Sequence, residues 1–151
     1  MASHRIFTLL LLTSLAACAS SQGPQRNSDS PLADTNWQLL AIAGQASIES
    51  PHPVTLGIEE TAKEIRGRGP CNRYFGNVQI NDESATFIAG ALAATKMYCG
   101  QPEGVMDLEL KFMSAFNEVR QYVRDGQSLS LQDTEGNEVL AFTQVFLEQD
   151  Q

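Results

Sequence analysis

This chain has few cysteines and histidines, and few residues that carry a positive charge. Among 151 residues there are three cysteines, two histidines and ten lysines or arginines, against eighteen acidic residues. A nucleic acid needs a basic face, so the net charge of −8 argues against such a ligand. The sequence also has no Gly-rich phosphate loop, nucleophile elbow or metalloprotease helix. We therefore expect no catalytic site, metal or cofactor.

The first seventeen residues have the composition of an export signal. Arg5 supplies a basic start, and the apolar run over residues 6–15 is too short to span a bilayer as a stable helix. Residues 15–18 read LAAC and resemble the bacterial lipobox, in which a peptidase cuts before the cysteine and the new N-terminus is acylated. The alternative is an ordinary secretory signal whose cleavage site contains a cysteine. The resemblance predicts that a lipid on Cys18 joins the chain to a membrane.

The location of the mature chain follows from the same resemblance. Ala19 is not the aspartate associated with retention in the inner membrane. In a Gram-negative source, the resemblance implies an outer-membrane lipoprotein facing the periplasm. Loss of residues 1–17 removes Arg5 and His4, which leaves nine basic residues against eighteen acidic ones and a single histidine, His52.

A change of composition divides the mature chain into two parts. Residues 18–33 are rich in Ser, Gln, Gly, Pro and Asn and have almost nothing apolar to bury, so they predict a flexible tether. Such a tether reaches roughly 20 Å on average. Residues 34–151 have room for one domain with a modest core.

Apolar residues at every second position dominate this domain. The alternation is clear at residues 54–58, 84–87 and 128–132, which predicts half-buried antiparallel strands. Further strand candidates run over 37–43, 64–68, 74–80, 119–124 and 138–142. Turn sequences at 81–83, 125–126 and 135–137 separate neighbouring candidates. About eight short strands predict a mostly β fold, a single antiparallel barrel-like domain or a sandwich.

One segment after Pro102 has a helical period instead. A single apolar stripe is formed by Val105, Leu108, Phe112, Phe116 and Val119. We expect this helix to pack on the sheet or to plug one end of the barrel. Glu109 also projects onto the apolar side, where an unpaired carboxylate would cost several kcal/mol. It should therefore meet a donor or lie at the edge of the stripe, and a functional carboxylate is the alternative.

Cys71 and Cys99 are the cysteines left in the domain if Cys18 is acylated. An even number of thiols in an oxidising compartment favours a disulfide, which would close a loop of about 29 residues. The chain-entropy model gives such a bridge about 3 to 4 kcal/mol. A catalytic thiol is the alternative, with His52 as its base. A Cys and His metal site is short of ligands, because structural zinc takes four.

Residues around these cysteines form a pattern that extends through most of the domain. Its members are Trp37, Gly67, Cys71, Asn72, Gly76, Thr95, Met97, Cys99, and Glu109 three residues before the aromatic Phe112. The pattern resembles the META-domain family, which includes the HslJ-like heat-shock lipoproteins. The resemblance implies a small, mostly β, barrel-like domain with one helix, a link to heat shock and novobiocin tolerance, and no activity that can be transferred.

The expected function is a non-catalytic binding or interaction role in envelope stress tolerance. The alternative is a barrel that carries a small apolar ligand or lipid. Arg66 and Arg68 share a strand face and Arg73 follows the first cysteine, so these three form a candidate anion-binding patch. Its partner would be an envelope protein or polymer, and a solvated strand face is the alternative. Asn72 is expected to bond the backbone of its own turn.

Overall fold

The computed structural model describes residues 30–45 and 49–146, and Cys18 and the export signal lie outside these ranges. Within them the chain forms nine strands and one helix. The strands are β1 (Thr35–Ile42), β2 (Thr55–Ile58), β3 (Glu64–Arg68), β4 (Arg73–Asn81), β5 (Thr86–Ala89), β6 (Ala93–Ala94), β7 (Gln121–Asp125), β8 (Ser128–Gln132) and β9 (Glu138–Val145). The helix, α1 (Val105–Glu118), lies between β6 and β7 in the chain.

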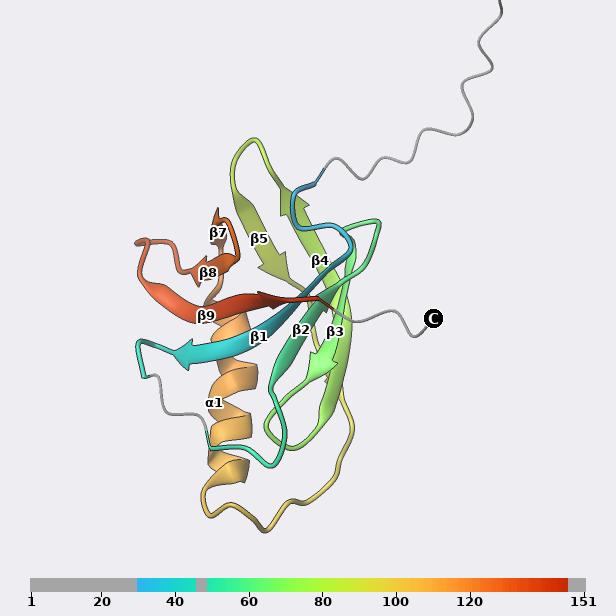
Figure 1. The fold of residues 1–151 in the computed structure, drawn as a ribbon, viewed down its shortest axis with the longest axis vertical. Helices are drawn as coiled ribbons and strands as arrows, with labels where there is room; N and C mark the ends of the chain where they lie inside the picture. Colours follow the sequence, from blue (N-terminus) through green and yellow to red (C-terminus); the bar gives the residue numbers. More distant parts are fainter. Residues whose placement is uncertain (1–29, 46–48, 147–151) are drawn as a thin grey trace, which may run out of the picture.

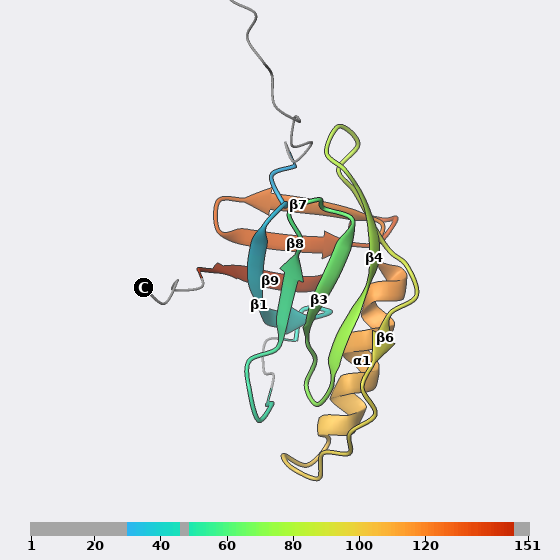
Figure 2. The same ribbon diagram turned by 90° about the vertical axis from the view of Figure 1, so that its right-hand side faces the viewer.

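Eight of the strands close into an antiparallel barrel (Figures 1 and 2). The order around the barrel is β3-β2-β1-β9-β8-β7-β5-β4, and pairing of β3 with β4 completes the ring. The ninth strand, β6, pairs with the start of β4 through two residue pairs, whereas β5 pairs with the end of β4. The predicted mostly β barrel with one helix is therefore confirmed. The sequence did not predict β6, because two alanines carry no alternation of apolar and polar residues.

Tight turns at the predicted positions form three of the hairpins. The turn between β7 and β8 contains Gly126 and that between β8 and β9 contains Gly136, with φ of 55° and 85°. Both angles lie in the left-handed region that glycine enters without a steric cost. The turn between β4 and β5 follows Asn81, the last residue of β4, whose side-chain Oδ1 accepts a bond from the backbone N–H of Ser84 at 3.0 Å. Turn chemistry thus fixes which strands are neighbours.

The barrel has one weak seam, between β5 and β7. A single residue pair, Thr86 with Gln121, joins these strands, and backbone bonds from Phe87 to Arg120 and from Tyr122 to Ala85 flank it. Every other neighbouring pair in the ring shares at least four residue pairs. Closure at this point therefore depends on few hydrogen bonds.

Side chains fill the interior of the barrel. Its largest fully buried members are Trp37, Tyr74, Phe87, Phe112, Phe116 and Phe142. Helix α1 contributes Phe112 and Phe116 and packs against β9, β5 and β1. Three aromatic rings meet where it enters the core, with centroid separations from 5.3 to 5.6 Å among Tyr74, Phe112 and Phe116. The helix predicted from the three-and-four period is thus the element that completes the core.

The packed part of the chain begins earlier than the sequence predicted. Leu32 is fully buried, and its carbonyl accepts a bond from the hydroxyl of Thr35 at 2.5 Å. Residues 30–33, which the composition assigned to the tether, therefore belong to the folded domain. A lone leucine in a polar stretch gives no periodic signal. Helix α1 is too short and too polar to cross a membrane, and it is the one helix in the ranges that the structure describes.

Candidate functional site

The carboxylate of Glu109 clamps α1 to the turn between β3 and β4. Its side chain is only 6% exposed, and its two oxygens accept the backbone N–H groups of Cys71 at 2.9 Å and of Asn72 at 3.3 Å. A Cβ atom at Gly69 would lie 2.7 Å from Oε2, so only glycine leaves room for the carboxylate. The expectation that Glu109 meets a donor is confirmed, and the arrangement gives it a structural task.

Asn72 joins the same turn to the segment that follows β6. Its Oδ1 accepts a bond from the hydroxyl of Thr95 and another from the backbone N–H of Met97, each at 2.8 Å. Its Nδ2 donates to the carbonyl of Met97 at 3.4 Å. The Thr95 hydroxyl in turn accepts the backbone N–H of Arg73 at 3.2 Å. The Asn72 side chain therefore bonds a segment more than twenty residues away. The expected bond within its own turn is made by its carbonyl instead, which accepts the backbone N–H of Gly69 at 2.7 Å.

A disulfide between Cys71 and Cys99 closes this region covalently. The two α-carbons lie 5.9 Å apart, within the limit of about 7 Å for a bridge. Both sulfur atoms are consumed by the bond, so neither cysteine is the nucleophile considered as an alternative. Together the disulfide, the Asn72 bonds and the Glu109 bonds tie three separate segments to one point, here called the β3–β4 clamp.

The remaining motif residues also hold the fold together. A Cβ at Gly67 would lie 2.0 Å from the carbonyl oxygen of Thr55, and one at Gly76 would lie 2.7 Å from the side chain of Leu92. Tyr74 donates its hydroxyl to that same Thr55 carbonyl at 2.8 Å. At Gly67 the clash would be with the backbone of β2, so a larger residue does not fit, whereas at Gly76 the Leu92 side chain would have to shift.

Trp37, the first residue of the motif, is fully buried on β1. Its indole N–H donates to the hydroxyl of Thr35 at 2.7 Å, and the guanidinium of Arg124 lies 5.3 Å from its ring centre. The apolar ring is thereby buried without leaving its one donor unpaired. Trp37 anchors the start of the barrel.

Two ionisable side chains near the β3–β4 clamp have shifted pKa values. Burial, followed by the positive charge of Arg68, lowers the pKa of His52 below its usual 6.5, against an opposing effect of Glu109. Burial, reinforced by Glu109, raises the pKa of Tyr74 well above 10. Both groups are therefore neutral at pH 7, and the two cysteines of the domain are joined in the disulfide, so neither offers His52 a thiol.

The opposite, outward face of β3 and β4 carries a ladder of polar and aromatic side chains. The strand register places three outward pairs in a row: Arg68 with Arg73, Arg66 with Phe75, and Glu64 with Asn77. Surface depressions of about 570 and 510 Å³ lie on this face. The first is lined by Arg68 and Arg73 and the second by Glu64 and Asn77, while Arg66 and Phe75 line both. We call the two depressions together the outer groove.

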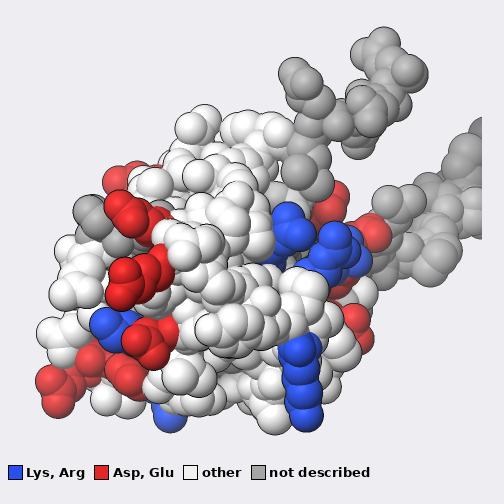
Figure 3. All heavy atoms as spheres, turned by 90° about the horizontal axis from the view of Figure 1, so that it is seen from below, with Lys and Arg blue, Asp and Glu red and all other residues white. Residues whose placement is uncertain are grey.

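The structure thus brings the predicted arginine patch together, although its members differ in whether an acidic side chain pairs with them. Arg66 pairs with Glu59, with Nη1 to Oε1 at 2.6 Å. Arg68 and Arg73 have no acidic partner among the described residues, and the buried Nε of Arg68 has no hydrogen-bond partner there either. Seen from below, acidic side chains dominate the left of the molecule, while most of the basic side chains in view lie toward the right, with acidic ones beside them (Figure 3).

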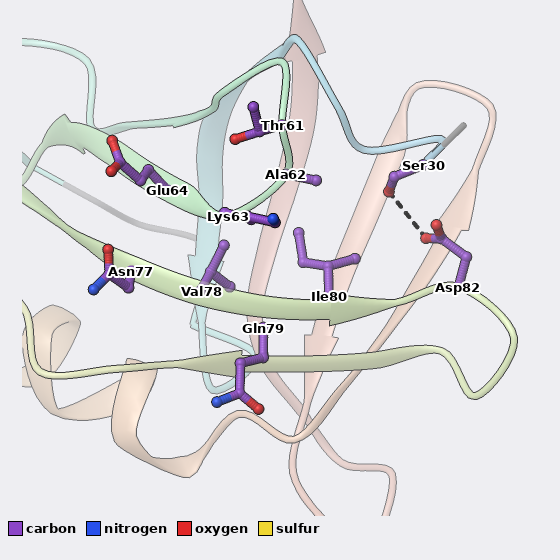
Figure 4. A pocket seen from close by; sticks show the side chains of 10 residues that line it. All are labelled: Ser30, Thr61, Ala62, Lys63, Glu64, Asn77, Val78, Gln79, Ile80 and Asp82. Atoms are coloured by element: carbon purple, nitrogen blue, oxygen red, sulfur yellow. Dashed lines mark hydrogen bonds between the residues drawn. The ribbon is translucent and has the colours of Figure 1, made fainter. Parts of the chain in front are cut away.

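The largest of the hollows described, of about 810 Å³, adjoins the outer groove at Glu64 and Asn77, which line both (Figure 4). Val78 and Ile80 point from β4 toward Ala62 and Lys63 in the turn between β2 and β3. Ser30 closes the far end by donating its hydroxyl to Asp82 at 3.0 Å. The lining mixes short apolar and polar side chains without a cluster of like charges, so it offers less chemistry than the outer groove.

Comparison with known proteins agrees with the barrel and the motif cluster. A META domain matches residues 30–146, which is most of the chain. The chain belongs to the META domain family. Among curated proteins, none matches this META-domain chain.

Solved structures share its fold. The NMR structure of a protein from Burkholderia xenovorans is 25% identical, covers 77% of this chain and 85% of its own, and has a TM-score of 0.59. A second NMR structure is 21% identical, with coverages of 73% and 88% and a TM-score of 0.56. The crystal structure of a DUF4847 family protein from Bacteroides vulgatus is 14% identical, with coverages of 80% and 97% and a TM-score of 0.55. The last two show the fold alone.

Sequence reasoning missed several residues of the outer groove. Phe75 and Asn77 occupy the outward positions of β4, between the buried Tyr74 and Val78. The alternation along β4 was the signal that could have found them. Glu64 was overlooked because one acidic residue at the start of a strand looks like any solvated side chain.

Proposed function

We propose that this META-domain protein is a non-catalytic binding protein of the bacterial cell envelope. Acylated Cys18 would hold it at the outer membrane, and the outer groove would bind an envelope component. The role would be to maintain the envelope under heat shock or novobiocin-type antibiotic stress. The observation that carries the proposal is the outer groove itself, where two arginines that have no acidic partner among residues 30–45 and 49–146 face each other on an acidic chain.

The state of the candidate catalytic residues supports a non-catalytic role. Cys71 and Cys99 are joined in a disulfide, and both oxygens of Glu109 already accept backbone N–H groups. A general acid or base must be within hydrogen-bond reach of a substrate proton. Glu109 is instead buried behind the turn that it holds.

The packed barrel favours binding on the outside over carriage of a ligand within. A barrel of eight strands encloses either its own side chains or one small molecule. In this chain aromatic side chains from the strands and from α1 occupy the described interior. A hollow of about 380 Å³ beside α1, lined in part by Ile42, Leu108 and Val139, is where the carrier alternative would place its ligand.

A co-sedimentation experiment with isolated envelope fractions tests the proposal. The triple variant Arg66→Gln, Arg68→Gln, Arg73→Gln should lose most of its binding to sedimented cell-wall and membrane material. Its matched control, Lys63→Gln, Lys96→Gln, Lys111→Gln, removes the same charge from other surfaces and should bind as the wild type does. Equal loss in both variants would mean that net charge alone governs binding, and no loss in either would contradict the proposal.

The membrane attachment has its own test. Cys18→Ser removes the acylated side chain, so the protein should move from the membrane fraction to the soluble fraction of the envelope. Fractionation of cells that express each form measures this directly. An unchanged membrane fraction would refute acylation at Cys18.

A further inference from the structure

We propose that the outer groove binds an extended peptide of about four residues with a free carboxylate and a free amine. The carboxylate would lie between Arg68 and Arg73, and the amine beside Glu64. This inference rests on the proposed function, because it takes the same groove as the binding surface. It adds the chemical class of the ligand and the direction in which the ligand lies.

The basic end of the groove is incomplete without an anion. Arg68 and Arg73 are directly opposed on neighbouring strands, and like charges in this position destabilise a sheet. No acidic side chain of the described residues pairs with either of them, and Nε of Arg68 is buried without a partner. A carboxylate between the two guanidinium groups would accept N–H bonds from both of them and cancel the repulsion.

The acidic end lies at a defined distance from the basic end. Glu64 and Arg68 are the first and last residues of β3, and both side chains point outward. Four strand residues at about 3.3 Å each separate them by about 13 Å. An extended peptide of four residues has the same span between its terminal amine and carboxylate. Arg66, between them, is already neutralised by Glu59 and so does not compete for the ligand's carboxylate.

The middle of the groove fits an apolar side chain. Phe75 is 64% exposed although it lies on β4, which directly follows the disulfide-bonded turn of the β3–β4 clamp. Its ring lies between the two depressions and lines both. Gly57, on the far side of β3, lines the same depression and leaves its floor open, because a Cβ there would lie 3.2 Å from Oδ1 of Asn36. A leucine or similar side chain of the ligand could pack on the ring over this floor.

The signs of the charges favour a peptide over a polyanion. A chain of net charge −8 repels a polyanionic ligand at long range, and Glu59 and Glu64 would repel it within the groove. A ligand with one charge of each sign meets the opposite sign at both ends. Asn36 and Asn77 add amide groups beside the path, which can bond a peptide backbone.

Isothermal titration calorimetry with a defined probe tests this inference. The probe is an unblocked tetrapeptide of alanine at both ends and two leucines between them, compared with its N-acetylated form, its C-amidated form and inorganic phosphate. Blocking either end should weaken binding about tenfold, because each removes one charge-assisted contact. Arg73→Gln should abolish the preference for a free carboxylate only, and Glu64→Gln the preference for a free amine only. Lys111→Gln and Glu118→Gln, on α1, make the same charge changes away from the groove and should bind the probe as the wild type does.

Several outcomes would overturn the inference while sparing the proposed function. These are phosphate binding as tightly as the peptide, an equal affinity for the blocked and free peptides, or peptide binding that Arg73→Gln and Glu64→Gln leave unchanged. The inference would also fail if the protein bound no peptide while its binding to envelope fractions still depended on Arg68 and Arg73. If the arginine variants bind envelope fractions normally, the proposed function itself fails. Unchanged thermal unfolding of each variant shows that the effects are local.

Discussion

The two faces of the β3–β4 hairpin differ in how their polar groups are used. On the inner side and at its turn, the buried Glu109 and Asn72 have their oxygens and the amide nitrogen bonded to named partners. On the outer side, Arg68 and Arg73 face each other without an acidic partner among the described residues. The motif that identifies the family therefore builds the scaffold, while the surface suited to binding lies outside the motif.

The residues that identify the family in sequence are therefore not the residues that would bind a ligand. Glycines, cysteines and a buried carboxylate are identifiable in sequence because few residues can replace them at such close contacts. The arginines and Phe75 stand on an open strand face, which accepts many side chains. Substitutions on the inner side should accordingly lower stability, whereas substitutions on the outer face should weaken binding and leave stability nearly unchanged.

The largest expected effect is on the inner side, at Phe112. Its ring is fully buried against Tyr74 and Phe116, so Phe112→Ala should lower the free energy of unfolding by about 3 to 5 kcal/mol. Leu110→Ala is the matched control. Leu110 lies on the same helix but is 69% exposed, so this variant should lose much less of its free energy of unfolding. Urea denaturation measures both. A loss below about 1 kcal/mol for Phe112→Ala would mean that α1 buries another face.

The disulfide should have the next largest effect. The double variant Cys71→Ser, Cys99→Ser removes the bridge and should lower the free energy of unfolding by about 3 to 4 kcal/mol in the chain-entropy model. Reduction of the wild type should reproduce most of that loss. In a chain that carries Cys18→Ser, an alkylating reagent should find no free thiol before reduction. Labelling of either cysteine without reductant would show that the bridge is incomplete.

Glu109 comes third and tests the β3–β4 clamp directly. Glu109→Ala leaves the backbone N–H groups of Cys71 and Asn72 without their acceptor, at a cost of about 3 kcal/mol. Glu109→Gln keeps one acceptor oxygen and should cost about half as much. Chemical denaturation of the two variants gives the comparison. If neither variant is destabilised, the clamp does not hold α1 and a functional role for the carboxylate gains weight.

The smallest effect on stability is expected on the outer face. Arg73→Gln should change the free energy of unfolding by less than about 0.5 kcal/mol, since the side chain is exposed. Its opposition to Arg68 also predicts that added salt stabilises the wild type slightly more than the variant. Thermal unfolding at low and high salt measures this difference. A large destabilisation of Arg73→Gln would remove the distinction between the two faces.

Much of the fold could be predicted from local patterns. The period of α1, the alternation of the main strands and the turn sequences are all properties of consecutive residues. Leu32 and β6 escaped prediction because one leucine and two alanines carry no period, and only packing shows their places.

The candidate site could be predicted only in part. The three arginines were correctly grouped, but the pairing of Arg66 with Glu59 depends on the hairpin formed by β2 and β3. The partners of Glu109 lie nearly forty residues away in sequence, and those of Asn72 more than twenty. Such contacts follow from the register of the closed barrel, which no local pattern specifies.

The short seam between β5 and β7 has a consequence for how the barrel opens. One residue pair and two flanking backbone bonds join these strands, whereas longer ladders join the others. Backbone amides at Phe87 and Tyr122 should therefore exchange with solvent deuterium earlier than those within the ladder between β1 and β9. The domain would then open locally along one line while the clamped hairpin and its outer groove keep their shape.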